Sequence, residues 1–118
     1  MRRPGSMLMP GDVVELDLGT PAGSEAGLRR PAVVVTAARV LAGGPNVVQV
    51  VPLTRTIRSS STEVLIDPDH GNRLSVRSSA QCQHVRSVAI TRIQHRTGNV
   101  GPVVLGEVRE TLALLLDL

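Results

Sequence analysis

The distribution of apolar positions along the chain predicts a small, mainly β protein. Between Asp12 and Leu18, apolar and acidic residues alternate with the period of two that is typical of a half-buried strand. The runs 32–37 and 47–53 are continuous, apolar and β-branched, which indicates strands buried on both faces. A short strand is expected at 63–66, and the alternation resumes from 79 to 88.

Two polar loops and a final helix complete the predicted elements. The loops follow the first and third strands, at 19–27 and 54–62, and a turn is expected at 67–72. Residues 90–93 either extend the preceding strand or form a short helical turn. A break is expected at 98–102, and after Gly106 the apolar residues follow helical spacing. About five short antiparallel strands and one helix indicate a compact, partly closed barrel.

The length and composition of the chain fit one domain. With 118 residues, 42% of them apolar, it can bury a single modest core. We expect residues 1–9 to form a flexible leader and residues 10–118 to form the domain. No apolar run is long enough for a signal peptide or a membrane span, and the one cysteine, Cys82, cannot form a disulfide within the chain. We therefore expect a cytoplasmic protein.

The charged residues favour an anionic partner. All 13 basic residues are arginines, and with 10 acidic residues they give a net charge of +3. The guanidinium fork matches phosphate or carboxylate oxygens in pairs, so RNA and acidic peptides both fit, although a solvated surface remains an alternative for any single arginine. The chain has no Phe, Trp or Tyr, which excludes the aromatic stacking platforms of RRM and OB-fold modules.

Familiar motifs for metals and nucleotides are absent from the sequence. There is no P-loop, dinucleotide-binding or HExxH motif, and Cys82 has no second cysteine with which to form a zinc site. The acidic turn at 67–69 lacks the ligands that close a calcium loop. No spacing relates the three histidines to a nucleophile. We expect no metal, no cofactor and no catalytic histidine.

Several blocks of the sequence, taken in order, resemble a known family. They are Gly11-Asp12, Gly23-Ser24-Glu25, Arg30-Pro31 with the valines that follow, Val51-Pro52-Leu53-Thr54, and Ser78 with Cys82, Gln83 and Val85-Arg86. Their order, type and approximate spacing resemble the MazF/PemK family of toxin–antitoxin endoribonuclease toxins, over nearly the whole chain from Pro10. The sequence departs from the family pattern by having no aromatic residue after Gly11-Asp12 and by doubling the arginine before Pro31.

The resemblance implies a fold and a function. The fold is a small SH3-like antiparallel barrel, CcdB- and MazF-like, with five strands and a C-terminal helix, assembled as a homodimer. The function is that of a type II toxin, a metal-independent and sequence-selective endoribonuclease. It would cleave single-stranded mRNA, tRNA or rRNA to a 2′,3′-cyclic phosphate, and a cognate antitoxin with an acidic disordered segment would inhibit it. Two alternatives stay open, a CcdB-like gyrase-poisoning toxin and a non-catalytic RNA-binding module.

The resemblance also assigns the residues of the site. It places the catalytic pair on Arg30 and Thr54, with Glu25 as an acidic residue that some members also need. Arg30 would bind the phosphate oxygens, Thr54 would donate its hydroxyl, and Glu25 would assist proton transfer. Neighbouring polar residues are expected to bind RNA, namely Arg29, Arg55, Arg58, Ser59 and Ser78. Without the resemblance, the favoured interpretation would be an Arg30–Glu25 ion pair that only holds a loop, with Thr54 capping the end of a strand.

Overall fold

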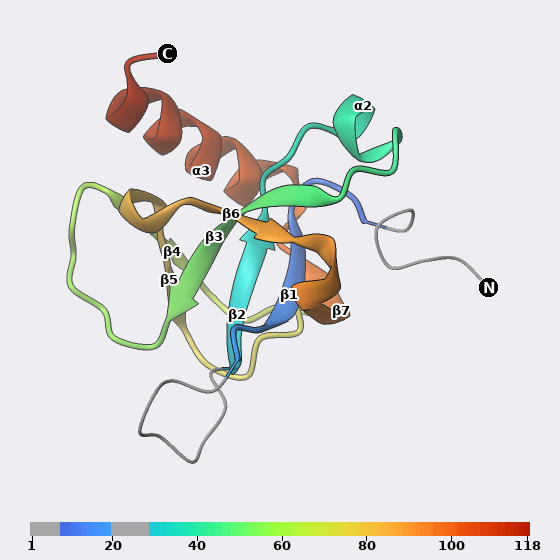
Figure 1. The fold of residues 1–118 in the computed structure, drawn as a ribbon. Helices are drawn as coiled ribbons and strands as arrows, with labels where there is room; N and C mark the ends of the chain where they lie inside the picture. The colour runs from blue at the N-terminus through green and yellow to red at the C-terminus, as the bar shows by residue number, and fades with distance from the viewer. Residues whose placement is uncertain (1–7, 20–28) are drawn as a thin grey trace.

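The computed structural model describes residues 8–19 and 29–118 (Figure 1). Within them one antiparallel sheet has seven strands, namely β1 (Asp12–Asp17), β2 (Arg29–Val34), β3 (Val47–Thr54), β4 (Glu63–Ile66), β5 (Ser78–Gln81), β6 (Arg86–Ala89) and β7 (Ile93–Asn99). The helices are α2 (Ala38–Leu41), α3 (Gly101–Leu116) and two 3₁₀ turns, η1 (Cys82–His84) and η2 (Ile90–Arg92). No helix in these residues is long and apolar enough to cross a membrane.

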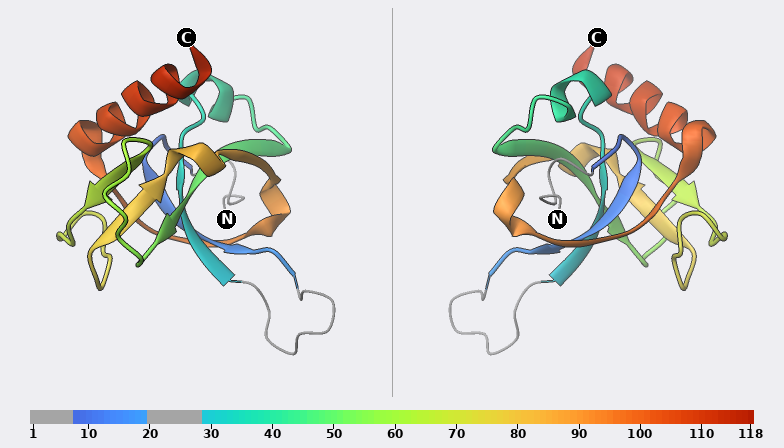
Figure 2. Two further views of the ribbon diagram at one scale, coloured as in Figure 1. Left: turned by 90° about the vertical axis from the view of Figure 1, so that its left-hand side faces the viewer. Right: turned by 90° about the vertical axis from the view of Figure 1, so that its right-hand side faces the viewer.

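Strand β3 joins the two halves of the sheet. The strand order is β4-β5-β3-β2-β1-β7, and β6 also pairs with β3. On one side, β3 pairs with β6 over Val47–Val50 and then with β5 at Leu53 and Thr54. On its other side it pairs with β2. Because successive parts of β3 pair with different strands, the sheet curls around itself, as the side views show (Figure 2). The predicted partly closed barrel is confirmed, with seven strands in place of five.

The central strands are buried on both faces because the protein has two apolar cores. Val33 and Val51 belong to the first core, while their neighbours Val34 and Val50 belong to the second. Helix α3 covers the first core with Val108, Leu112 and the preceding Val100, and Leu8, Leu41, Val88 and Ile93 cover the second. The prediction that the two continuous apolar runs are strands buried on both faces is therefore confirmed for 47–53 and for 32–34, whereas β2 begins earlier than the first run, at Arg29, and ends at Val34 rather than at residue 37.

Three further predicted boundaries differ from the structure. The alternation expected from 79 to 88 is interrupted by η1 and forms two strands. Strand β7 continues through Gly98 and Asn99, where a break was expected, because both residues pair with β1. Helix α3 begins at Gly101 rather than after Gly106, because Pro102 occupies the first turn, where a missing N–H costs nothing.

The packed domain also begins earlier than expected. Of the predicted leader at 1–9, residues 1–7 lie outside the described part of the chain. Leu8 is only 4% exposed and packs in the second core. The backbone N–H of Met9 donates a hydrogen bond of 2.7 Å to the carboxylate of Asp12, a residue that is itself fully buried. The packed part of the chain thus includes Leu8, two residues before the expected start at Pro10.

A tight turn between β4 and β5 rests directly on β7. The Asn72 side chain, 1% exposed, accepts hydrogen bonds from the backbone N–H groups of Asp69 (3.1 Å) and Leu74 (2.9 Å). Gly98 lies beneath this turn, and a Cβ built on it would be 2.5 Å from the carbonyl oxygen of Gly71. Only glycine therefore allows the turn to approach β7 so closely.

We predict that Gly98→Ala lowers the free energy of unfolding by about 1–3 kcal/mol, because the new methyl group forces the turn off β7. The matched control is Gly106→Ala, since Gly106 lies within α3 and a Cβ there would meet nothing within 4 Å. That control is expected to raise stability by up to about 1 kcal/mol, because alanine favours a helix interior. Urea unfolding measures both variants, and equal effects would show that the close approach at Gly98 is unimportant.

Candidate functional site

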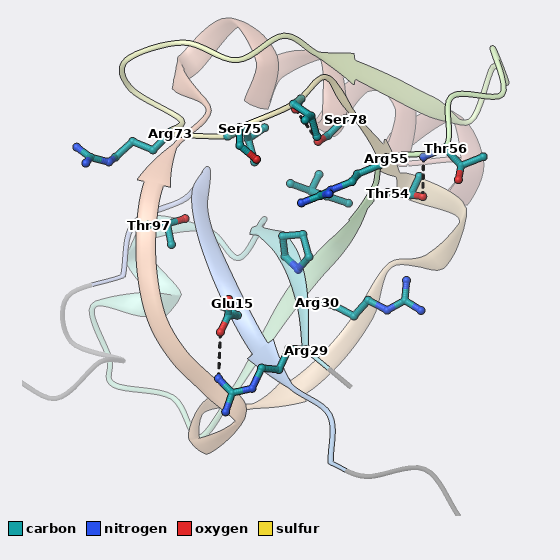
Figure 3. A pocket seen from close by; sticks show the side chains of 14 residues that line it. Glu15, Arg29, Arg30, Thr54, Arg55, Thr56, Arg73, Ser75, Ser78 and Thr97 are labelled. Carbon is teal, nitrogen blue, oxygen red and sulfur yellow. Dashed lines mark hydrogen bonds and ion pairs between the residues drawn. The ribbon is translucent and has the colours of Figure 1, made fainter. Parts of the chain in front are cut away.

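A groove of about 640 Å³ opens where β2 begins and β3 ends (Figure 3). Five charged residues line it, Arg29, Arg30, Arg55, Arg73 and Glu15, and its other walls come from Pro31, Leu53, Thr54, Thr56, Leu74, Ser75, Val76, Ser78 and Thr97. Four arginines against one carboxylate make the groove strongly positive. A volume of this size accommodates a ligand larger than a single ion.

The register of the antiparallel strands brings these residues together. In the β2–β3 pair Ala32 lies opposite Pro52, so two residues further along Arg30 and Thr54 reach the same end of the sheet. In the β1–β2 pair Glu15 lies opposite Pro31. Residues that are far apart in sequence, such as Glu15 and Thr54, 39 positions apart, therefore share one groove.

The two consecutive arginines of β2 point in different directions. Successive side chains of a strand alternate between its faces. Arg29 extends toward Glu15 and makes an ion pair with it, with Nη1 and Oε1 3.3 Å apart. Arg30 extends away from this pair, on the side where Thr54 lies (Figure 3). The doubled arginine thus supplies one side chain to each side of the groove.

The hydroxyl of Thr54 is oriented by the backbone that follows it. Thr54 Oγ1 accepts a hydrogen bond of 3.1 Å from the N–H of Thr56. Because a hydroxyl has a single hydrogen and that bond uses its oxygen as acceptor, the O–H remains able to donate to a ligand. Arg55 follows directly and extends its guanidinium toward the middle of the groove (Figure 3). The end of β3 therefore offers a hydroxyl donor and a cation side by side.

The groove contains many, but not all, of the predicted site residues. It brings together Arg29, Arg30, Thr54, Arg55 and Ser78. Arg58 and Ser59 do not line it, and the Arg58 guanidinium instead lies 3.7 Å from the Glu63 carboxylate. Glu25 lies outside the described residues. Arg30 and Thr54 thus line one groove, while their catalytic roles and the placement of Glu25 stay predictions.

Several groove residues carry no signal that sequence reasoning recognised. Glu15 occupies a polar position in an alternating strand, which is ordinarily a solvated face. Arg73 follows the predicted turn, where the backbone adopts a left-handed φ of 56° that the hydrogen bonds of Asn72 support. Thr56, Ser75 and Thr97 reach the groove through the tertiary fold. The turn predicted at 67–72, which Arg73 directly follows, was the only sequence feature that could have indicated this residue.

A second polar cluster lies beside the groove, around the buried carboxylate of Glu63. That side chain is 2% exposed and accepts hydrogen bonds from Gln83 Nε2 at 2.6 Å and Ser79 Oγ at 2.9 Å. The hydrogen bond from Gln83 lowers the pKa of Glu63, with smaller contributions in the same direction from Ser79 and Arg58, while burial opposes them. The cluster holds β4, β5 and η1 together just behind the end of β3.

Neither a metal site nor a reactive thiol is apparent in the described part of the chain. Among residues 8–19 and 29–118, no three His, Cys, Asp or Glu side chains gather in a way that would hold a metal ion. Cys82 is fully buried, and this burial raises the pKa of its thiol to about 11. A thiol with so high a pKa is a poor nucleophile at neutral pH. The chemistry of the groove rests on arginines, hydroxyls and carboxylates.

Comparison with known proteins identifies the family and supports the fold. A sequence model of the family described as PemK-like, MazF-like toxin of type II toxin-antitoxin system matches residues 9–116. The chain belongs to this toxin family. The expected resemblance is therefore confirmed, and the gyrase-poisoning alternative is not favoured.

Individual relatives cover nearly the whole chain. Endoribonuclease MazF9 of Mycobacterium tuberculosis is 34% identical over 116 residues, which are 95% of this chain and 98% of that protein. A MazE-MazF crystal structure from Deinococcus radiodurans matches with 31% identity and a TM-score of 0.78, covering 94% of this chain and 96% of that one. The Mycobacterium tuberculosis toxin MazF-mt6, at 21% identity and a TM-score of 0.72, covers 91% of this chain and 97% of its own, and supports the fold alone.

We predict that Glu63 contributes stability that is lost in acid. Because the pKa of Glu63 is lowered on folding, its contribution is complete above the pKa of an unfolded glutamate, about 4.3, and disappears as the pH falls through the lower folded value. Glu63→Gln should therefore unfold with a shallower pH dependence between about pH 5 and pH 3 than the parent. Urea titrations at several pH values measure this.

Glu110→Gln is the control for this test, because Glu110 is an exposed residue of α3. It should retain the pH dependence of the parent. Identical pH profiles for the Glu63 variant and the parent would show that the Gln83 and Ser79 hydrogen bonds do not favour the charged carboxylate.

Proposed function

We propose that this toxin is a metal-independent, sequence-selective endoribonuclease that cleaves single-stranded RNA and leaves a 2′,3′-cyclic phosphate. The observation that carries the proposal is the arginine-lined groove in which Arg30 and Thr54 come from the ends of adjacent strands. The name of the 34%-identical relative, an endoribonuclease, supports the same activity. The physiological RNA is an mRNA, a tRNA or an rRNA.

The chemistry requires an internal transfer at one phosphate. The ribose 2′-oxygen attacks phosphorus and loses its proton, the bond to the 5′-oxygen of the next nucleotide breaks, and that oxygen gains a proton. Negative charge grows on the non-bridging oxygens as the fifth bond forms. Arg30 can hold two of these oxygens with its planar fork, and the free O–H of Thr54 can donate to one of them. Fixed donors of this kind often supply the largest part of the rate enhancement.

Proton transfer needs a further group in this scheme. An arginine side chain stays protonated and is a poor base. Glu25 fits the role of the acidic partner that receives or relays the 2′-proton, because a carboxylate is an acceptor within the same loop that leads into Arg29 and Arg30. Arg55 and Arg73 line the groove and fit contacts with neighbouring phosphates.

Two surfaces of the protein, helix α3 and the groove, indicate its partners. We infer a cytoplasmic homodimer, since α3 leaves apolar side chains such as Val103 and Leu114 each 74% exposed, and a second copy would cover them. We also infer inhibition by a cognate antitoxin whose acidic, disordered segment lies across the arginines of the groove. The matched Deinococcus radiodurans structure is described as a MazE-MazF crystal structure, which supports a partner of this kind.

We predict that Arg30→Ala cleaves RNA about a hundredfold or more slowly than the parent, because the charge facing the developing oxyanion is lost. Thr54→Ala should cost less, about tenfold, since one neutral donor is removed. Cleavage should survive EDTA and require a 2′-OH in the substrate. One gel series at a fixed salt concentration measures these rates.

Matched variants make this test specific. Arg109→Ala removes an exposed arginine of α3, remote from the groove, and should cleave as the parent does. Replacement of His70, His84 or His95 by alanine should leave most activity. Loss of activity in EDTA, or a dead histidine variant beside an active Arg30→Ala, would place the chemistry elsewhere.

We further predict that antitoxin binding weakens with added salt and with Arg55→Ala. Removing one charge-assisted hydrogen bond from the groove should reduce affinity by about tenfold or more, and salt screens what remains. Calorimetry with the antitoxin measures both effects, with Arg109→Ala as the control that binds normally. An affinity unchanged by salt and by Arg55→Ala would indicate that apolar contacts elsewhere dominate the complex.

A further inference from the structure

Among the described residues that line the groove, Glu15 supplies the single carboxylate, and phosphate binding does not explain it. Glu15 lies on β1 with its side chain 35% exposed, among four arginines. A negative charge repels the phosphates of any RNA that enters. Its exposed ion pair with Arg29 contributes little to stability, because solvent screens such pairs. A carboxylate favours ligand binding in such a groove if it accepts hydrogen bonds from the ligand itself.

The surroundings of Glu15 suit a nucleobase rather than a phosphate. The pyrrolidine ring of Pro31, an exposed residue directly opposite Glu15 in the β1–β2 register, offers an apolar surface. Arg29 presents a planar guanidinium on the same side. The chain has no Phe, Trp or Tyr, so the flat surfaces on which a base can stack next to Glu15 are these two and the imidazole of His95, which lies opposite Glu15 in the β1–β7 register. The site thus combines stacking surfaces with an acceptor at their edge.

The carboxylate is also accessible from the groove. Both contacts that the described residues make with it involve Oε1, which lies 3.3 Å from Arg29 Nη1 and 3.9 Å from His95 Nε2. Each carboxylate oxygen has two lone pairs, so Oε2 and the second lone pair of Oε1 can accept from a ligand. The ion pair fixes the direction of the carboxylate without using its full acceptor capacity.

We propose that Glu15 reads a base of the RNA and selects guanine, an inference that rests on the ribonuclease function proposed above. An ionised carboxylate only accepts hydrogen bonds. Guanine presents two adjacent donors on its Watson–Crick edge, N1–H and the N2 amino group, and these match two carboxylate oxygens. Adenine, cytosine and uracil each place an acceptor beside their donor, which would face the carboxylate and repel it. Single-stranded RNA exposes this edge for recognition.

This role is one of specificity and is separate from the reacting phosphate. Glu15 and Arg29 lie on one side of the groove, whereas Thr54 lies across it and Arg30 points toward that far side (Figure 3). The groove volume of about 640 Å³ leaves room for a base beside Glu15 while a neighbouring phosphate reaches Arg30 and Thr54. Guanine is therefore expected at one fixed position next to the cut.

The test first maps where the parent protein cuts a random-sequence RNA, and then measures kcat/KM on short RNAs that differ at one base. We expect guanine to be enriched at one position beside the cut. Inosine there, which lacks the N2 amino group, should lower kcat/KM of the parent by about tenfold, since one of the paired hydrogen bonds is lost. In Glu15→Gln and Glu15→Ala the guanine and inosine RNAs should be cut at equal rates.

Controls separate a specific role from a general one. Glu110→Gln, on exposed α3, should keep the full preference for guanine, and Glu15→Gln preserves the size of the side chain so that it folds. No guanine enrichment in the parent, or an unchanged preference in both Glu15 variants, would overturn the inference. Folded Glu15 variants that cut no RNA of any sequence would also overturn it and would place Glu15 in the chemistry. If the parent itself cuts no RNA, the proposed ribonuclease function fails instead.

Discussion

The whole arrangement depends on strand β3 being hydrogen-bonded on both edges and buried on both faces. A strand in that position must be apolar along most of its length, and Val48, Val50 and Val51 are completely buried. The residues of this strand that can serve the groove with polar groups therefore lie where it ends, at Thr54 and Arg55. The same holds for β2, whose inner residues are buried while Arg29 and Arg30 at its start are exposed. The groove is thus a consequence of where the buried strands end.

Much of the fold could be predicted because its signals are local. The continuous valine-rich runs indicated β2 and β3, and the alternation near Asp12 indicated β1. The signal failed where tertiary packing overrides the local pattern. Strand β7 has four successive exposed residues, Gln94 to Thr97, and contains Gly98, so it shows no period of two. It is a strand because β1 needs a partner along its free edge and because the Asn72 turn needs a glycine beneath it.

Some residues of the candidate site could likewise be predicted from the sequence, and others could not. Arg30 and Thr54 were predictable, because each is marked by a short block of sequence that resembles the family. Glu15 and Arg73 were not, because their place in the groove depends on the pairing of β1 with β2 and on a left-handed residue after Asn72. Arg58 shows the reverse case, since it belongs to the expected loop but lies against Glu63 instead. Long-range register, which a single sequence does not reveal, decides the position of Glu15, whereas the local backbone decides that of Arg73 and a nearby ion pair that of Arg58.

The opposite orientations of Arg29 and Arg30 limit how this sequence can change over evolutionary time. Point substitutions at either position alter one side of the groove and leave the other unchanged. Base selection on the Arg29 side and phosphate binding on the Arg30 side can therefore change independently. An inserted or deleted residue between the first loop and Pro31 would have a different effect, because a shift of one position exchanges the faces of a strand. Both arginines would then change sides at once. We therefore expect relatives to vary in the length of the preceding loop but to keep the spacing from the arginine pair to the buried valines.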